Sequence, residues 1–169
     1  LSAALLAMVV GAQAAERPNV LLICVDDLKP MLGCYGDATV KSPNIDALAN
    51  SGVRCTSGYV SAPYCSPSRA GMLTGRYQTR FGHEFNPHVG DEATLGLPLD
   101  QRTIADYLGS AGYATSLVGK WHQGFSASHH PQSRGFGEFF GFLVGGHNFL
   151  LHKDAKPVFG SAHSHDMIY

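Results

Sequence analysis

Three short groups of polar residues in this chain have types and spacings that could carry chemistry. The first is the adjacent pair Asp26 and Asp27, which directly follows an apolar run. Two neighbouring carboxylates repel each other unless a cation holds both, and hard oxygen ligands suit Ca²⁺ or Mg²⁺. The pair therefore indicates a divalent metal site; the alternative is an ordinary turn in which one Asp caps the next segment.

The second group is the run Cys65-Ser66-Pro67-Ser68-Arg69. We expect Cys65 to lie just before a helix, whose backbone N–H groups and dipole favour an anion. Arg69 lies four residues on, one turn inside the helix, and can lean back toward the same anion. The residue types suggest a thiolate nucleophile. The alternative is a capped helix with an arginine on its surface.

The third group is Lys120 and His122. A spacing of two in an extended stretch places both side chains on the same side of the chain. A cation beside an imidazole suits an anionic substrate and proton transfer. The alternative is a surface lysine next to a histidine with a structural role.

Strands and helices must bring these groups together. The run 19–25 is apolar on both faces, as in a central parallel strand, and ends at Asp26. Alternating strands and helices predict an α/β fold with a mainly parallel sheet and helices on both faces, where ligands collect at the carboxyl ends of strands. The remaining expected elements are helices at 42–52, 67–74 and 103–111, strands at 53–60 and 113–118, a loop at 119–124, and loops only from 126 to 169.

The helices carry their own boundary signals. Ser42 and Ser66 are the expected caps of the first two, and Gly52 and Gly75 the expected stops. Gly112 is the expected end of the third helix.

The composition limits the class of protein. The chain has 169 residues, 12 Lys and Arg, 13 Asp and Glu, and a formal net charge of −1, with 44% hydrophobic residues. There is no basic surplus to neutralise phosphates, which argues against a nucleic-acid partner. High apolar content with low net charge excludes intrinsic disorder, and the length suits one domain.

The N-terminal residues predict export. An apolar run over 1–10 precedes Ala12-Gln13-Ala14, a small-x-small cleavage pattern, so we expect residues 1–14 to be part of a signal peptide. An N-terminal core helix is the alternative. The run is too short to span a bilayer, so no membrane span is expected in the mature protein, which would be periplasmic or secreted. Export permits disulfides, and pairing among the four cysteines (Cys24, Cys34, Cys55 and Cys65) stays open.

Taken together, these groups resemble a known family. Cys65-x-Pro-Ser-Arg69, with its tail Leu73-Thr74-Gly75-Arg76, is similar to the signature of the type I sulfatases of the alkaline phosphatase superfamily. Val25-Asp26-Asp27 resembles that family's first metal-binding segment, and residues 119–124 resemble its Gly-Lys-Trp-His-x-Gly segment. The resemblance implies that residues 18–169 are the N-terminal part of an alkaline-phosphatase-like sulfatase domain.

The resemblance also implies a role for each group. Cys65 would be oxidised by a dedicated maturation enzyme to formylglycine, whose hydrated diol attacks sulfur in a sulfate ester. Asp26 and Asp27 would hold a divalent cation, Ca²⁺ before Mg²⁺, with the modified Cys65 beside it as a further ligand. Arg69 would hold the diol. Lys120 would bind sulfate, and His122 would be the base for the elimination step.

Some of the family's features are changed or missing. Residues 134–142 resemble its Gly-Phe-Asp segment, but Gly137 replaces the usual Asp. His147 follows where relatives place a residue that contacts substrate; a loop histidine without that role is the alternative. The later Asp-Asn pair that completes the family's metal site does not occur, and the chain begins with Leu1. We therefore expect a piece of a longer protein, inactive by itself and weak in binding metal.

The implied activity is hydrolysis of a sulfuric ester, with a sulfated glycan or aryl sulfate as substrate. Two alternatives remain: a phosphonate monoester or phosphodiester hydrolase of the same superfamily, and a non-catalytic module that binds sulfated glycans.

Overall fold

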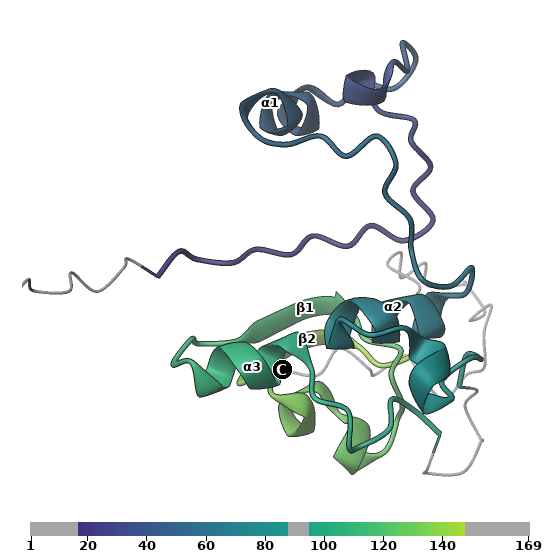
Figure 1. Cartoon of the computed structure of the whole chain (residues 1–169), viewed down its shortest axis with the longest axis vertical. Coiled ribbons are helices and arrows are strands. Elements are labelled where there is room, and N and C mark those ends of the chain that lie inside the picture. Colours follow the sequence, from purple (N-terminus) through teal and green to yellow (C-terminus); the bar gives the residue numbers. More distant parts are fainter. Residues whose placement is uncertain (1–16, 88–94, 148–169) are drawn as a thin grey trace, which may run out of the picture. The chain divides into compact units, whose positions relative to one another are not determined.

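The computed structural model describes residues 17–87 and 95–147 in two units, with one boundary between Asp46 and Ala47, and each unit is described by itself. The predicted signal peptide lies outside the described residues. Figure 1 shows the chain coloured along its sequence.

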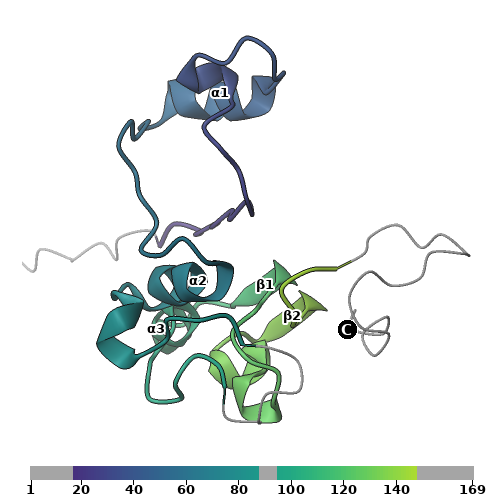
Figure 2. The same cartoon turned by 90° about the vertical axis from the view of Figure 1, so that its right-hand side faces the viewer.

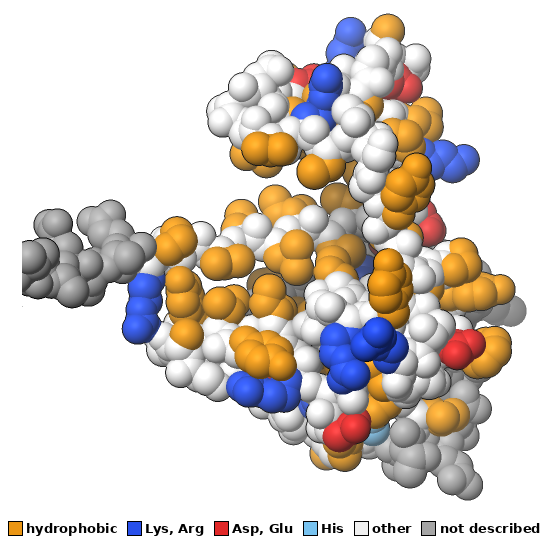
Figure 3. Space-filling model, in the orientation of Figure 1, with side chains coloured by type: hydrophobic (Ala, Val, Ile, Leu, Met, Phe, Trp, Pro, Cys, Tyr) orange, Lys and Arg blue, Asp and Glu red, His pale blue; other side chains and the backbone are white. Residues whose placement is uncertain are grey.

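The first unit opens with an extended segment that is not a strand. The prediction of a central strand over 19–25 is wrong, because no backbone partner pairs with it within the described residues. An extended chain becomes a strand only when a neighbour takes up its hydrogen bonds. Its apolar side chains are instead exposed, Leu21 by 84% and Ile23 by 70%, and they stand along the segment in Figure 3.

A cluster of hydrogen bonds links the chain before the first α-helix to the start of that helix. The short helix η1 (Gly33–Tyr35) donates the Gly33 N–H to Ser42 Oγ at 2.9 Å and the Cys34 N–H to Asp46 Oδ1 at 2.7 Å. Ser42 Oγ donates in turn to Asp46 Oδ1 at 3.0 Å. The helix α1 (Pro43–Ser51) confirms the predicted helix, with the Ser42 hydroxyl serving the η1 turn.

The second unit contains α2 (Cys65–Thr74), which begins earlier than predicted. The first helical hydrogen bond runs from the Ser68 N–H to the Tyr64 carbonyl at 3.0 Å, so Cys65 is the first helical residue. The prediction of Ser66 as a cap is therefore wrong. The predicted stop at Gly75 is confirmed, because Gly75 takes the left-handed conformation (φ 65°) and closes the helix.

The predicted third helix is confirmed as α3 (Ile104–Ser110). Its start is a capping box: Thr103 Oγ1 accepts the Asp106 N–H at 3.3 Å, and Asp106 Oδ2 accepts the Thr103 N–H at 2.7 Å. The short helix η2 (Gln78–Phe81) follows α2 along the chain.

Two parallel strands form the sheet of this unit. β1 (Ser116–Lys120) pairs with β2 (Glu138–Phe142), with Ser116 opposite Glu138 and Lys120 opposite Phe142. Figure 2 shows the strands side by side, and α2 and α3 lie beside them in Figure 1. This parallel pair with helices confirms the α/β class.

Three sequence predictions near the sheet need correction. The strand predicted at 113–118 occurs as β1, which begins and ends later in the chain than predicted. Lys120 therefore belongs to the strand and not to a loop. The strand predicted at 53–60 is absent, and those residues are exposed without a strand partner. The prediction of loops only beyond residue 126 is wrong as well, since η3 (Ala127–His129), η4 (Pro131–Arg134) and β2 lie there.

The core of this unit fixes the segment that follows β1. Leu73 of α2 and Ala105 of α3 pack with Trp121 and Phe136, and the two aromatic rings meet edge to face at 5.9 Å. The Trp121 indole N–H also donates to the His129 carbonyl at 2.8 Å. Burial of the large Trp121 ring at the end of β1 restricts the positions of its neighbours, Lys120 and His122.

Two further observations bear on the sequence predictions. None of the four cysteines forms a disulfide in the described part of the chain. Within residues 17–87 and 95–147, no helix has the length and apolarity needed to cross a bilayer.

Candidate active site

Cys65 lies at a position where a helix favours negative charge. It is the first residue of the ten-residue helix α2 and is partly exposed. The unpaired N–H groups of a first helical turn carry a partial positive charge. Cys65 lies at the positive end of the helix dipole, within the helix and not before it as expected.

The next residue, Ser66, anchors this turn. Ser66 is fully buried, with its backbone N–H donated to Asn86 Oδ1 at 2.9 Å. Its hydroxyl lies 2.7 Å from His83 Nε2. No sequence motif points to a role for His83 or Asn86. Their only signal was a polar cluster shortly after the Cys-x-Pro-Ser-Arg run, which does not identify a partner.

The protonation of His83 sets the direction of this hydrogen bond. Burial, with the nearby His129 as a smaller cause, lowers the pKa of His83, while a hydrogen bond to the backbone of Gly96 opposes the shift. A neutral imidazole has one donor and one acceptor nitrogen. If the other ring nitrogen donates to the backbone of Gly96, Nε2 is the acceptor for the Ser66 hydroxyl.

Lys120 and His122 lie where β1 ends. The ladder continues past the strand, because the N–H groups of Trp121 and His122 donate to the carbonyls of Phe142 and Leu143 at 2.9 and 3.0 Å. His122 is buried, with a positive φ of 58°. The alternation of an extended chain therefore stops before His122, so the spacing argument for a shared side does not apply here.

The imidazole of His122 is packed closely by the loop after β2. A Cβ atom at Gly145 would lie 2.7 Å from His122 Cε1, whereas one at Gly146 would meet no atom within 4 Å. Only glycine at position 145 lets the backbone approach the ring this closely.

Two hydrogen bonds join the Cys65 helix to the Lys120 and His122 segment. Arg69 Nη1 donates to the Lys120 carbonyl at 2.9 Å. Gln123 Nε2 donates to the Ser66 carbonyl at 2.9 Å. The structure thus brings together the segments of all four predicted catalytic residues, Cys65, Arg69, Lys120 and His122, which are separated by about fifty positions in the chain.

The predicted metal ligands Asp26 and Asp27 belong to the first unit. They form an exposed turn, in which Asp27 has a φ of 54°. Their oxygen donors are of the kind that Ca²⁺ prefers, although that ion takes six to eight oxygen ligands. No group of three or more His, Cys, Asp or Glu side chains gathers in the part of the chain that the structure describes.

His147, the predicted substrate contact, stacks on Phe142. The ring centroids are 5.1 Å apart and the planes differ by 21°. His147 follows β2 in the chain and lies in the same loop as Gly145. Gly137, which replaces the family's Asp, donates its N–H to the Thr115 carbonyl at 2.9 Å just before β2 begins.

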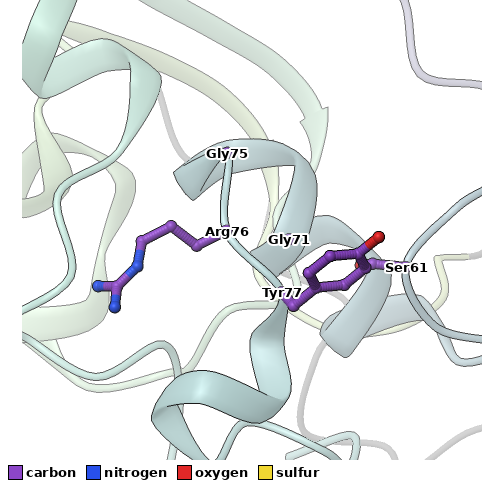
Figure 4. Close-up of a pocket in the computed structure, with 5 residues that line it drawn as sticks. All are labelled: Ser61, Gly71, Gly75, Arg76 and Tyr77. Atoms are coloured by element: carbon purple, nitrogen blue, oxygen red, sulfur yellow. The ribbon is translucent and has the colours of Figure 1, made fainter.

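A separate hollow lies at the other end of α2. It has a volume of about 190 Å³ and is lined by Ser61, Gly71, Gly75, Arg76 and Tyr77. Figure 4 shows the Arg76 side chain directed away from the Tyr77 ring. Arg76 donates a hydrogen bond to Gln101 Oε1.

Known proteins resemble the chain over most of its length. Human steryl-sulfatase is 40% identical over 163 residues, which cover 89% of this chain and 27% of that protein. Pig N-acetylgalactosamine-6-sulfatase is 41% identical over 135 residues, covering 76% of this chain and 26% of that protein. The chain therefore spans about a quarter of the length of the curated relatives it matches.

Solved structures and a family model point the same way. The crystal structure of Ps i-CgsB is 43% identical with a TM-score of 0.67, covering 70% of this chain and 26% of that one. The PsFucS1 sulfatase from Pseudoalteromonas sp. is 36% identical with a TM-score of 0.61, covering 68% and 23%. The model of the Sulfatase family matches residues 18–167. The chain belongs to the sulfatase family.

Proposed function

We propose that the protein containing this chain hydrolyses sulfate esters, with Cys65 as its nucleophile after conversion to formylglycine. The observation that carries the proposal is the joining of two segments in a chain of this family. The helix that starts at Cys65 is hydrogen-bonded to the strand end that bears Lys120 and His122, through Arg69 and Gln123.

The proposed reaction has two chemical steps. Hydrated formylglycine at position 65 carries two hydroxyl groups on one carbon. One hydroxyl oxygen bonds to the ester sulfur, the sulfur–oxygen bond to the alcohol breaks, and the alcohol leaves with the proton of that hydroxyl. His122 then takes the proton of the second hydroxyl, the carbonyl re-forms and sulfate departs. One water rehydrates the aldehyde, so each cycle consumes one water.

Fixed positive charge supports this assignment. Arg69 donates to the backbone carbonyl of Lys120, so both cationic residues belong to the joined segments, and the N-terminal end of α2 adds the partial positive charge of its dipole. Negative charge develops on the sulfuryl oxygens in the transition state. Preorganised cations at that position are the largest catalytic contribution in reactions of this type.

We propose that Asp26 and Asp27 hold a divalent cation, Ca²⁺ in preference to Mg²⁺. Two exposed carboxylates in one turn fit a hard cation in kind and supply part of the ligands it needs. When bound, such a cation lowers the pKa of a hydroxyl group and polarises the sulfate.

A sulfated glycan is the proposed substrate class. Pig N-acetylgalactosamine-6-sulfatase is among the relatives, and Ps i-CgsB has been solved with k-i-k-neocarrahexaose. An imidazole held flat against Phe142, as His147 is, suits a hydrogen bond to a sugar hydroxyl. We propose His147 as a substrate contact on this basis.

We also propose export, based on the pattern over residues 1–14. Sequencing the N-terminus of the mature protein tests this. A first residue at position 15 supports export, and an uncleaved N-terminus contradicts it.

Mass spectrometry of the complete gene product, expressed with a maturation enzyme, tests the nucleophile. The peptide that contains position 65 should be about 18 Da lighter than its cysteine form. Turnover of 4-nitrophenyl sulfate should exceed that of phosphodiester analogues, and C65S should release at most one alcohol per enzyme, because a serine sulfate ester cannot collapse to an aldehyde. Unmodified Cys65 with sulfated-glycan binding would favour a binding module instead.

A further inference from the structure

We propose that Gln123 is a positioning residue, which fixes the distance between the nucleophile at position 65 and the base His122. The inference rests on the proposed function and concerns a residue that the sequence motif leaves variable.

The contacts of Gln123 are unusual for a side chain in a loop. Gln123 is fully buried, and its amide nitrogen lies 2.8 Å from the His122 carbonyl and 2.9 Å from the Ser66 carbonyl. It also lies 3.2 Å from Ser66 Oγ. An amide NH₂ group has two hydrogens, and the two carbonyls at the shorter distances take them. One planar group therefore holds two peptide units that are far apart in sequence.

These two peptide units belong to the reacting segments. One carbonyl is that of His122 itself, and the other is that of the residue directly after Cys65. A change in the length of the bridge moves the two segments relative to each other. A displacement of about 1 Å can cost about a hundredfold in rate.

The far side of Ser66 is held independently of Gln123. Its hydroxyl is bonded to His83 and its N–H to Asn86, so the first turn of α2 cannot follow a shifted loop. The Arg69 bond to the Lys120 carbonyl does not involve Gln123, so we expect it to remain when Gln123 is changed. Loss of the bridge should therefore alter the spacing of the two segments while helix and strand remain joined.

Two substitutions remove the bridge in different ways. Gln123→Leu keeps the volume but leaves two buried carbonyls without their donor. Gln123→Asn keeps the amide, but one methylene less prevents it from reaching both carbonyls. Gln132→Leu is the matched control, because Gln132 is exposed and its side-chain amide donates to the Gly137 carbonyl at 3.3 Å, within its own loop.

The experiment measures kcat and KM with 4-nitrophenyl sulfate, formylglycine content and melting temperature, in the complete and matured gene product. We expect kcat to fall about ten- to a hundredfold in both Gln123 variants, with KM within about twofold and formylglycine content unchanged. Gln132→Leu should match the wild type. If Gln123→Leu does not fold, Gln123→Asn decides.

The outcomes separate this proposal from the function on which it rests. A wild type that turns over sulfate esters, with Gln123 variants that keep kcat within twofold, overturns the positioning role alone. A lower melting temperature at unchanged kcat also overturns it, because it marks a purely structural role. A formylglycine-bearing wild type without sulfate-ester turnover overturns the proposed function and this inference with it.

Discussion

Arg69 donates a hydrogen bond from Nη1 to the backbone carbonyl of Lys120 at 2.9 Å. This bond joins the second turn of α2 to the last residue of β1. The bond to the carbonyl uses one nitrogen of the guanidinium, and the proposed contact with the group at position 65 would use the same planar fork. The same side chain can therefore hold the fold together and bind the reacting group.

Arg69→Lys should lower both activity and stability. Lysine carries its three donors on a single nitrogen, so it cannot reproduce the planar fork that would span the Lys120 carbonyl and the proposed nucleophile. We expect kcat for 4-nitrophenyl sulfate to fall by about a hundredfold or more. Loss of a hydrogen bond from a charged donor should lower the free energy of unfolding by about 1.5–3 kcal/mol, measured by urea denaturation. Arg80→Lys, at an exposed position, is the control. Activity within twofold of wild type would contradict the role.

Gly145→Ala should impair the step that we propose for His122. The added methyl group would lie 2.7 Å from the His122 Cε1 atom, so the ring must move. Gly146→Ala is the matched control, because its methyl group would meet nothing within 4 Å. We expect kcat to fall about tenfold or more in Gly145→Ala, with sulfated enzyme accumulating during turnover. Equal kcat values for the two variants would show that His122 tolerates the displacement.

Acid should destabilise the protein through His83. Burial lowers the pKa of His83 below its ordinary value of 6.5. As pH falls below 6.5, the unfolded chain binds a proton that folded His83 does not take up, so folding stability falls. His129 contributes in the same direction, because burial and then the charge of Arg134 lower its pKa.

Melting temperatures measured between pH 7.5 and 5.5 test this linkage. The wild type should lose stability toward pH 5.5, and His83→Gln should show a smaller loss over the same range, because glutamine does not titrate. An identical pH dependence in the two proteins would exclude His83 as a source.

Chelation of calcium should abolish turnover in the complete protein. We expect EGTA to remove activity, and Ca²⁺ to restore it better than Mg²⁺. Asp26→Asn or Asp27→Asn should raise the Ca²⁺ concentration for half-maximal activity by about tenfold or more. Asp37→Asn is the control, because the Asp37 carboxylate already accepts the N–H groups of Thr39 and Val40. A normal calcium requirement in both Asp26 and Asp27 variants would place the metal elsewhere.

The sequence determined those features that depend on short-range chemistry. Pro43 and Gly52 predict the bounds of helix α1, and Gly112 predicts the end of α3, because caps and stops act within one turn. The Cys65 motif and the Gly-Lys-Trp-His segment identified the family for the same reason, since their chemistry lies in residue types at fixed spacing.

The tertiary structure decided what depends on distant partners. β2 carries a glycine inside a short aromatic run, and it becomes a strand because β1 pairs with it. The run 19–25 has the stronger strand pattern, yet it is unpaired among the described residues. Ser66 has the residue type of a helix cap, but its hydroxyl is taken by His83, seventeen positions away. A hydrogen bond needs a partner in space, and local sequence does not specify where a distant partner will lie.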